Sequence, residues 1–475
     1  MGHDLVVLGG GPGGYAAAFR AAAHGLDVAL VERDAVGGTC LHRGCIPSKA
    51  LLHVAEVLGE VERAEVLGLR LRFDGIDADD LGAFRDGVVA KLHKGLAGLV
   101  AKRTTPYRGT GRIVEADGGV AVEVTDDGGG TEVVTGRHVV VATGSRPRTL
   151  PGIEVDGERV QTSDEALFAA PPRSAVIVGG GAIGMEFASM WRPMGAEVTV
   201  VEALDRVLPL EDADVSRTLQ RSLGRRGVEI LTSARLQSVE PDGDGVRVEV
   251  TVDGDTRVLN VERALIATGR APVTDEVGLE SFDVLDEGGF VRTDAWGATG
   301  VPGLWAVGDI TAGPALAHAA FAEGFAVADR IAGRPHAQPV DHIHTPRVIY
   351  SHPEVASVGL TEAQARERYG DDAVAVTTSS LHGNAKGIIA NSDGFVKVVH
   401  AAGAPPVGSP GDGGAVLGVH IIGPHATDLI GEATLATSWE AVPAELAAIT
   451  HAHPTLYEAL GEAFQSAAGL PFHGA

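Results

Sequence analysis

The stretch DLVVLGGGPGGYAAAFRAAAHGLDVALVE, residues 4–32, decides the first part of the fold. An apolar run predicts a buried strand, a helix of small residues follows it, and a second strand ends in Glu32. Between the first strand and the helix stand three glycines with the spacing GxGxxG: Gly9, Gly11 and Gly14. Such glycines allow a tight turn, let the backbone approach a pyrophosphate and let the helix pack on the strand, while the helix N-terminus faces the phosphates. The stretch therefore predicts a Rossmann-like dinucleotide-binding domain, with Glu32 placed to bind a ribose hydroxyl.

The same pattern returns at residues 174–202, SAVIVGGGAIGMEFASMWRPMGAEVTVVE. Its three glycines are Gly179, Gly181 and Gly184, and its second strand ends in Glu202. In both copies the acidic residue follows the first glycine by 23 positions, from 9 to 32 and from 179 to 202. Two dinucleotide sites in one chain indicate two cofactors that exchange electrons, rather than one cofactor and a small substrate.

Glu202 also bears on which nicotinamide cofactor the second site takes. A carboxylate there accepts hydrogen bonds from a free 2′-hydroxyl and repels a 2′-phosphate, so NAD is favoured over NADP. Arg206 would reverse this preference if it reached the phosphate; the alternative is a surface arginine on the following loop.

Length and composition bound the class of protein. With 475 residues, and ~150 residues per domain, the chain has room for about three domains. Its 44% apolar residues and 65 glycines are typical of a water-soluble α/β protein with many tight turns. The formal net charge of −25 argues against nucleic acid or an anionic membrane as partner, but leaves room for a basic protein.

The chain shows no pattern of a signal peptide, and no uncharged apolar run long enough to cross a bilayer. We therefore expect a cytoplasmic protein. In that compartment a lone disulfide is more often catalytic than structural.

Cys40 and Cys45 are the only two cysteines. In a regular helix residues five apart are separated by ~7.5 Å of rise, beyond the ~7 Å over which two Cα atoms can be bridged. A disulfide here needs a distorted turn, which Gly44 permits, and Pro47 suits the first turn of a helix that follows. At a helix N-terminus we expect a lowered thiol pKa, as dithiol exchange requires. The alternatives are a structural disulfide or two unrelated buried thiols.

At this point the sequence resembles the FAD-dependent pyridine nucleotide-disulfide oxidoreductases, and among them those that oxidise dihydrolipoamide. The resemblance runs in order along essentially the whole chain. It rests on the two dinucleotide motifs and on GGTCLHRGCIPSK, VVVATGSRPRTLPG, ALIATGRAPV, LWAVGDITAGPALAHAAFAEG, VIYSHPEVASVGLTE and HAHPTLYEALGEAF.

The resemblance implies an α/β fold with two Rossmann-like domains, for FAD and NAD, and a C-terminal α/β dimerisation domain. We expect the FAD domain at 1–147, the NAD domain at 148–273, a central segment that completes the FAD site at 274–344, and the interface domain at 345–475. No metal site is expected. Further cofactor contacts implied by the resemblance are Gly111, Thr143, Gly144, Ser145, Asp309, Leu316, Ala317 and His318 for FAD, and Gly269 near the nicotinamide.

The resemblance also assigns the chemistry. Cys45 would lie against the flavin and Cys40 would exchange with substrate. Lys49 would lie near the reactive edge of the flavin, paired with Glu186. The remaining pair is His453, the acid/base, and Glu458, which orients it from one turn inside a helix that Pro454 can start.

By this resemblance the protein is a homodimer that oxidises protein-bound dihydrolipoamide with reduction of NAD. Its partners would be the lipoyl domain and the subunit-binding segment of the acyltransferase core of a 2-oxoacid dehydrogenase complex. The rivals are an NAD(P)H-dependent reductase of another small disulfide and a flavoprotein kept only for assembly. The phosphate-binding arginines of the NADPH-dependent reductases are absent at Ala203 and Pro209, and two cysteines in all exclude enzymes with a second redox pair.

Three departures from the family pattern matter. His42 and Arg43 stand where Asn-Val is common, and Tyr457 stands where Ser is frequent, so the surroundings of the thiols could differ. Residues 401–414, AAGAPPVGSPGDGG, are longer and richer in Gly and Pro than usual and predict a flexible surface loop.

Overall fold

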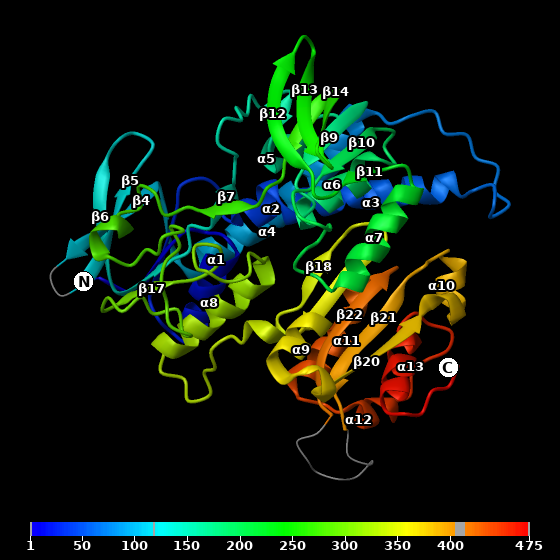
Figure 1. The fold of residues 1–475 in the computed structure, drawn as a ribbon. Helices are drawn as coiled ribbons and strands as arrows, with labels where there is room; N and C mark the ends of the chain where they lie inside the picture. Colours follow the sequence, from blue (N-terminus) through cyan, green and yellow to red (C-terminus); the bar gives the residue numbers. More distant parts are fainter. Residues whose placement is uncertain (1, 117–118, 404–413, 474–475) are drawn as a thin grey trace. The chain divides into compact units, whose positions relative to one another are not determined.

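The computed structural model describes residues 2–116, 119–403 and 414–473 (Figure 1). Most of the predicted loop at 401–414 therefore lies outside the described residues. The chain forms two compact units, and each is built from several stretches of sequence. Unit 1 comprises residues 1–51, 77–148 and 269–342; unit 2 comprises residues 52–76, 149–268 and 343–475.

Unit 1 is built on a seven-stranded sheet with the order β3-β2-β1-β6-β5-β4, to which β17 adds beside β6. Its strands are β1 (His3–Leu8), β2 (Val28–Glu32), β3 (Thr105–Arg108), β4 (Thr110–Ala116), β5 (Gly119–Thr125), β6 (Thr131–Val141) and β17 (Leu304–Ala306). Strand β6 belongs to two ladders: it pairs antiparallel with β5 up to Thr135 and parallel with β1 from Gly136 onwards. The segment that includes β17 thus returns to the sheet that the N-terminus begins.

The helices of unit 1 pack closely because their facing residues are small. They are α1 (Pro12–Ala23), α2 (Gly38–Arg43), the first part of α3 (Cys45–Glu62), α4 (Ala78–Arg103) and α8 (Ala317–Ile331). Helices α1 and α8 lie side by side (Figure 1), and a Cβ added at Gly324 would lie 2.5 Å from the Gly13 carbonyl oxygen.

Two short strands, β7 (Ser145–Pro147) and β16 (Arg270–Pro272), pair antiparallel where the chain leaves and re-enters the unit.

The first half of unit 2 repeats the dinucleotide-binding topology. Its all-parallel sheet has the order β11-β10-β9-β15-β8. The elements are β8 (Val160–Gln161), α5 (Ser163–Ala166), β9 (Ser174–Val178), α6 (Ala182–Trp191), β10 (Glu197–Val201), α7 (Ala213–Arg225), β11 (Glu229–Leu231) and β15 (Arg263–Ile266). A separate antiparallel sheet consists of β12 (Arg235–Asp242), β13 (Gly245–Val252) and β14 (Asp255–Val261).

The second half of unit 2 is a five-stranded antiparallel sheet with the order β18-β19-β22-β21-β20. The strands are β18 (Arg347–Ile349), β19 (Glu354–Gly359), β20 (Val374–Ser380), β21 (Phe395–Ala401) and β22 (Val416–Gly423). The helices are α9 (Glu362–Tyr369), α10 (Ala385–Ile389), α11 (Ala426–Ser438), α12 (Pro443–Ala447) and α13 (Glu458–Ala467). Helices α11 and α13 cover one face, where alternate strand residues join them in an apolar core.

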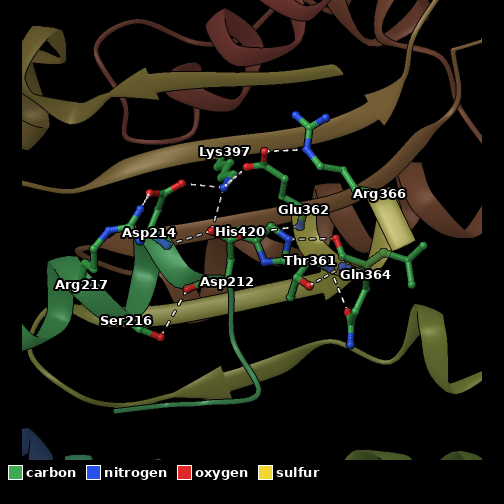
Figure 2. Close-up of polar contacts among 11 residues, drawn as sticks. Asp212, Asp214, Ser216, Arg217, Thr361, Glu362, Gln364, Arg366, Lys397 and His420 are labelled. Carbon is green, nitrogen blue, oxygen red and sulfur yellow. Dashed lines mark hydrogen bonds and ion pairs between the residues drawn. The ribbon is translucent and has the colours of Figure 1, made fainter. Parts of the chain in front are cut away.

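The opposite face of this sheet is polar and yet buried. Ser357, His420 and Lys397 are cross-strand neighbours on β19, β22 and β21, and none is more than 2% exposed. The Lys397 ammonium lies 2.8 Å from Asp212 Oδ1, 2.6 Å from Asp214 Oδ2 and 2.8 Å from Glu362 Oε2 (Figure 2). Because Asp212 and Asp214 begin α7, this ion cluster ties the nucleotide-binding half of unit 2 to the C-terminal sheet.

In the described part of the chain, no helix combines the length and the apolarity needed to cross a membrane.

Candidate functional site

The first glycine loop needs glycine at two positions for steric reasons. Gly9 has φ +105°, and a Cβ there would lie 2.3 Å from the Ala142 carbonyl oxygen. A Cβ at Gly14 would lie 1.8 Å from the Gly9 carbonyl oxygen. Both distances are far below van der Waals contact, so strand β1 and helix α1 can meet only through glycine.

The second glycine loop repeats this geometry. Gly179 has φ +111°, with a Cβ position 2.4 Å from the Ala267 carbonyl oxygen, and a Cβ at Gly184 would lie 2.0 Å from the Gly179 carbonyl oxygen. The internal repeat seen in the sequence is therefore a repeat of backbone contacts as well.

The middle glycine of each loop, by contrast, is not required by the protein itself. A Cβ at Gly11 would meet only the Gly38 Cα atom, at 3.9 Å, and a Cβ at Gly181 would meet nothing within 4 Å. These glycines are the N-cap residues of α1 and α6, and no described side chain caps either helix. The open space and the uncapped N–H groups fit the pyrophosphate of a dinucleotide, so the residues present fit both predicted cofactors.

The two acidic residues at the strand ends hold the glycine loops in place. Glu32 accepts the N–H groups of Gly10 (2.7 Å) and Asp34 (2.8 Å), one on each carboxylate oxygen. Glu202 does the same with the N–H groups of Gly180 (2.6 Å) and Leu204 (2.8 Å). A carboxylate has about four acceptor sites, so each can still accept hydrogen bonds from a ribose.

Arg206, which could have reversed the cofactor preference, bonds within its own loop. Its guanidinium donates to the Pro209 carbonyl oxygen at 3.1 Å and lies 3.7 Å from Asp205. This arrangement supports the reading of Arg206 as a loop residue rather than a phosphate ligand.

A polar cluster in unit 1 joins two of the predicted flavin contacts. The Ser145 hydroxyl donates to Asp309, while Arg270 Nε donates to the Ser145 hydroxyl at 2.6 Å and lies 3.9 Å from the Asp309 carboxylate. Sequence reasoning missed Arg270, although it follows Gly269 in the ATGR motif. It also missed Glu323, which accepts the Gly308 N–H at 2.6 Å and so braces the loop before Asp309.

The other predicted cofactor residues of unit 1 lie on turns and helix ends. The Thr143 hydroxyl donates to the Val273 carbonyl oxygen at 2.6 Å. Gly144 (φ +76°) and Gly269 (φ +107°) occupy conformations that favour glycine. Strand β4 carries Gly111, and the start of α8 carries Leu316, Ala317 and His318.

The two cysteines lie on either side of a break between helices. Helix α2 ends at Arg43, Gly44 leaves the helical conformation (φ −146°, ψ −109°), and α3 begins at Cys45. Both cysteines are in the thiol form, and a hydrogen bond joins them. A Cβ at Gly44 would lie 3.1 Å from the Thr39 carbonyl oxygen, so the break that brings the two sulfurs together favours glycine.

The prediction of a lowered thiol pKa is wrong for Cys40. Its hydrogen bond with Cys45, its burial and a negative charge on Cys45 all raise the pKa of the Cys40 thiol, and the nearby Lys49 ammonium only partly opposes them. The physical reason is that two thiols in contact share one proton more readily than they lose both. The same site raises the pKa of Tyr15 to about 12, mainly by burial and then by charge on the two cysteines.

The two unusual residues between the cysteines have defined partners. His42 Nε2 lies 3.0 Å from the Val36 carbonyl oxygen, and its ring packs edge-on against His93 of α4 with centroids 5.0 Å apart. Arg43 forms an ion pair with Asp34. Both side chains thus hold α2 to neighbouring segments of unit 1.

Glu186 and Ser189 fix helix α6 within unit 2. Glu186 is 8% exposed and accepts the Tyr350 N–H at 3.0 Å; one turn along, the Ser189 hydroxyl accepts the His352 N–H at 3.0 Å. Sequence reasoning did not foresee these backbone donors, because they follow β18, more than 150 residues away. The pairing of Glu186 with Lys49 stays a prediction.

His453 and Glu458 form a hydrogen-bonded pair, with Nδ1 3.1 Å from Oε2. The histidine side chain is 78% exposed, whereas the glutamate is 16% exposed. The expectation that Pro454 starts the next helix is wrong: α13 begins at Glu458. Side-chain bonds hold residues 451–457 in a compact loop, for the Thr455 hydroxyl donates to the Ala452 carbonyl oxygen.

No group of three or more His, Cys, Asp or Glu side chains that could hold a metal ion occurs within residues 2–116, 119–403 and 414–473.

Comparisons with known proteins agree along the whole chain. Residues 3–324 match the pyridine nucleotide-disulphide oxidoreductase family, and residues 345–464 match the dimerisation domain of that family. The dihydrolipoyl dehydrogenase of Bacillus subtilis is 40% identical over 482 residues, covering 99% of both chains. The dihydrolipoyl dehydrogenase 2 of Haloarcula marismortui is 40% identical, covering 99% of this chain and 98% of its own.

A solved structure is similar over the same length. LpdA from Mycobacterium tuberculosis superposes with a TM-score of 0.88 at 29% identity, covering 97% of this chain and 99% of that one. The expected α/β fold, with dinucleotide-binding and dimerisation domains, is confirmed. The chain belongs to the pyridine nucleotide-disulphide oxidoreductase family.

Proposed function

We propose that this protein oxidises protein-bound dihydrolipoamide to lipoamide and reduces NAD, using the Cys40–Cys45 pair and FAD. The observation that carries the proposal is the pair of cysteines hydrogen-bonded across the break at Gly44. Full-length relatives named dihydrolipoyl dehydrogenase at 40% identity support this substrate over other disulfides and dithiols.

The thiol chemistry follows from the cysteine pair. A substrate thiolate attacks the Cys40 sulfur, the Cys40–Cys45 bond breaks, and its electron pair stays on the Cys45 sulfur. The second substrate thiolate then attacks the mixed disulfide, which releases lipoamide and leaves both cysteines reduced. FAD held at the first glycine loop would supply the electron-accepting and hydride-transfer chemistry that links the reduced cysteine pair to NAD.

His453 and Glu458 supply the proton transfer. The exposed imidazole takes the proton of the substrate thiol, and Glu458, bonded to the other ring nitrogen, orients the ring and stabilises its charged form. Since His453 is 78% exposed in a single chain, a substrate and a second subunit would cover it. We propose a homodimer in which each His453 serves the cysteine pair of the partner subunit.

The cofactor sites follow the two glycine loops. Glu32, Ser145 and Asp309 would hold FAD at the first loop, and Glu202 would hold NAD at the second. Lys49 would supply a positive charge toward the reactive edge of the flavin, and Glu186 would pair with it, as the family resemblance implies. The four-segment division at residues 147, 273 and 344 and a cytoplasmic location remain part of this proposal.

The test uses mixed dimers of two inactive variants. In a dimer of one Cys45→Ser and one His453→Ala subunit, one shared site collects both lesions and the other collects neither. Each parent homodimer should be nearly inactive, while the purified mixed dimer should recover about half of wild-type lipoamide turnover, since one site of two is intact. A mixed dimer as inactive as its parents would show that His453 acts within its own chain or is not the base.

The net charge of −25 favours a basic docking partner, and we propose the subunit-binding segment of an acyltransferase core. Binding should weaken steeply between about 50 and 500 mM salt if it is mainly electrostatic. Binding that does not depend on salt, or no binding to an acyltransferase core, would disprove the proposed docking partner but would leave the proposed reaction unaffected.

A reductase of another small disulfide is the second candidate. Such reductases use NADPH, which the negative charge of Glu202 disfavours. Arg206 donates to the Pro209 carbonyl oxygen of its own loop and so is not directed at a 2′-phosphate. Comparing kcat/KM for dihydrolipoamide with NAD against that for glutathione disulfide with NADPH separates the two candidates.

A further inference from the structure

Tyr457 is the residue of the His-Pro motif that departs from the family pattern, where serine is frequent. Its role is open because the proposed chemistry uses only His453 and Glu458. The contacts of the loop at 451–457 give it one.

The residue just before His453 is held through both of its backbone polar groups. The Ala452 N–H donates to the Tyr457 hydroxyl at 2.7 Å, and the Ala452 carbonyl oxygen accepts from the Thr455 hydroxyl at 2.6 Å. Each distance is that of a well-formed hydrogen bond. Because the His453 side chain is mostly exposed, the orientation of its ring depends on this backbone and on Glu458.

The Tyr457 ring is itself anchored. It packs against the apolar core between α11, α13 and the C-terminal sheet, and its centroid lies 5.1 Å from that of the His451 ring. His451 is 6% exposed and bonds to Glu432 Oε1 at 2.9 Å and to the Ile449 carbonyl oxygen at 3.1 Å. The phenol therefore connects a fixed core to the exposed segment that carries His453.

The carboxylate of the pair is held from a second direction. Asn384 is 7% exposed, and its Nδ2 donates to Glu458 Oε1 at 3.3 Å and to the Thr455 carbonyl oxygen at 2.8 Å. The other carboxylate oxygen, Oε2, is thus left to His453. A serine at position 457 could not reach the Ala452 N–H as a tyrosine does, since its hydroxyl lies one bond beyond Cβ.

We propose that Tyr457 is a positioning residue for the acid/base step: its hydroxyl holds the Ala452 backbone so that His453 and Glu458 keep one orientation. This inference rests on the proposed role of His453. It adds a core-anchored hydroxyl that holds the loop before His453.

The experiment compares Tyr457→Phe with wild-type holoenzyme in dihydrolipoamide oxidation by NAD. We expect kcat to fall about fivefold to tenfold, ~1 to 1.4 kcal/mol at 1.36 kcal/mol per tenfold, with KM changed less than twofold. Reduction of an artificial acceptor by NADH, which does not need His453, should be unchanged. The kcat of Tyr457→Ser should fall at least as far as that of Tyr457→Phe. The matched control is Tyr107→Phe, which removes a hydroxyl 3.2 Å from His3 Nε2 and should leave kcat unchanged.

A second background separates positioning from general structural damage. His453→Gln alone should lower kcat about 100-fold or more. If Tyr457 acts through His453, adding Tyr457→Phe to His453→Gln should cost nothing further, because the two effects are coupled.

The outcomes are distinct. A His453→Gln enzyme that keeps lipoamide turnover would overturn the proposed base, and the role of Tyr457 with it. An impaired His453→Gln enzyme, with Tyr457→Phe within twofold of wild type, would overturn the positioning role alone. A further loss in the double variant, or a parallel loss of acceptor reduction, would show that Tyr457 acts by general stability instead.

Discussion

Replacing Lys397 by methionine tests whether the ion cluster of unit 2 stabilises the fold. The Lys397 side chain is 2% exposed and its ammonium contacts three carboxylates within 2.8 Å (Figure 2). Methionine keeps most of the volume and removes the charge, so the change isolates electrostatics from packing. Removal of one partner of a buried ion pair leaves an uncompensated charge and costs roughly 3–5 kcal/mol.

The structure places the expected cost at the low end of that range. Asp214 and Glu362 are 41% and 32% exposed and keep ion pairs with Arg217 and Arg366. Only Asp212, 3% exposed, would be stranded, and it keeps the N–H groups of Asp214 and Glu362. We therefore expect Lys397→Met to lower the free energy of unfolding by about 3 kcal/mol.

The assay is urea denaturation of the holoenzyme followed by far-UV circular dichroism. At an m-value of ~3 kcal/mol/M, the top of the range for small proteins, 3 kcal/mol moves the midpoint down by about 1 M, and by less if m is larger. Lys386 is exposed on α10, so Lys386→Met is the matched control and should change the urea midpoint little. Asp212→Asn added to Lys397→Met should recover part of the loss, because it removes the stranded charge. A midpoint equal to that of Lys386→Met would refute the reasoning.

The cost of Lys397→Met should also depend on pH. Lys397 lowers the pKa of Glu362 below its unfolded value of 4.5. It also lowers the pKa of Asp212 below 3.8, although burial opposes this shift. The stability that each lowered pKa contributes is present above the unfolded pKa and is lost as the pH falls. Burial lowers the pKa of Lys397, but the three carboxylates outweigh this effect and raise it overall. The stability that Lys397 contributes is therefore fully present below its unfolded pKa of 10.5 and is lost as the pH rises through its folded pKa. The gap between variant and wild type should be widest from about pH 5 to 10 and narrow outside that window.

Three substitutions test the candidate site itself. Cys45→Ser should keep FAD bound and abolish lipoamide oxidation, while transfer from NADH to artificial acceptors survives; retained lipoamide turnover would disprove the disulfide mechanism. Gly44→Ala places a Cβ 3.1 Å from the Thr39 carbonyl oxygen, so disulfide closure, measured by thiol titration after oxidation, should slow, and an unchanged rate would show that the break tolerates a side chain. Gly179→Ala, with its Cβ 2.4 Å from a carbonyl oxygen, should raise KM for NAD at least tenfold at unchanged flavin content, whereas an unaltered KM would contradict the steric argument.

The glycine loops and the cysteine pair were predictable because their constraints are local. A strand that turns directly into a helix leaves no room for a Cβ at Gly9, Gly14 or their repeats, so the spacing itself encodes the contact. The break at Gly44 follows from the short separation of two cysteines that must meet. The raised pKa of the Cys40 thiol was not predictable in the same way, because its largest causes are the hydrogen bond with Cys45 and burial.

The ion cluster and the bracing of His453 could not be read from the sequence. Ser357, Lys397 and His420 alternate with apolar residues in their strands, a pattern typical of a solvated sheet face. The N-terminus of α7 covers that face, but it lies 185 residues before Lys397 in the sequence, so no local pattern predicts the contact. The start of α13 was missed because the side-chain bonds of Thr455 and Tyr457, rather than the Pro454 ring, set where the helix begins.

Under the proposed function, cofactor choice would depend on Glu202, a carboxylate that also holds the second glycine loop in place. Glu202 is 8% exposed and binds two backbone N–H groups, so its carboxylate is held in one position. If the ribose binds there as proposed, that charge would repel a 2′-phosphate. We expect kcat/KM to favour NAD over NADP. Glu202→Gln keeps the shape and one acceptor oxygen but loses the charge, and should cut the preference about tenfold, ~1.4 kcal/mol, within what one charged hydrogen bond supplies. Glu32→Gln, the same change at the equivalent position of the other loop, should leave the ratio unchanged. Equal efficiency of wild type with both coenzymes, or an unaltered ratio in Glu202→Gln, would show that another residue sets the preference.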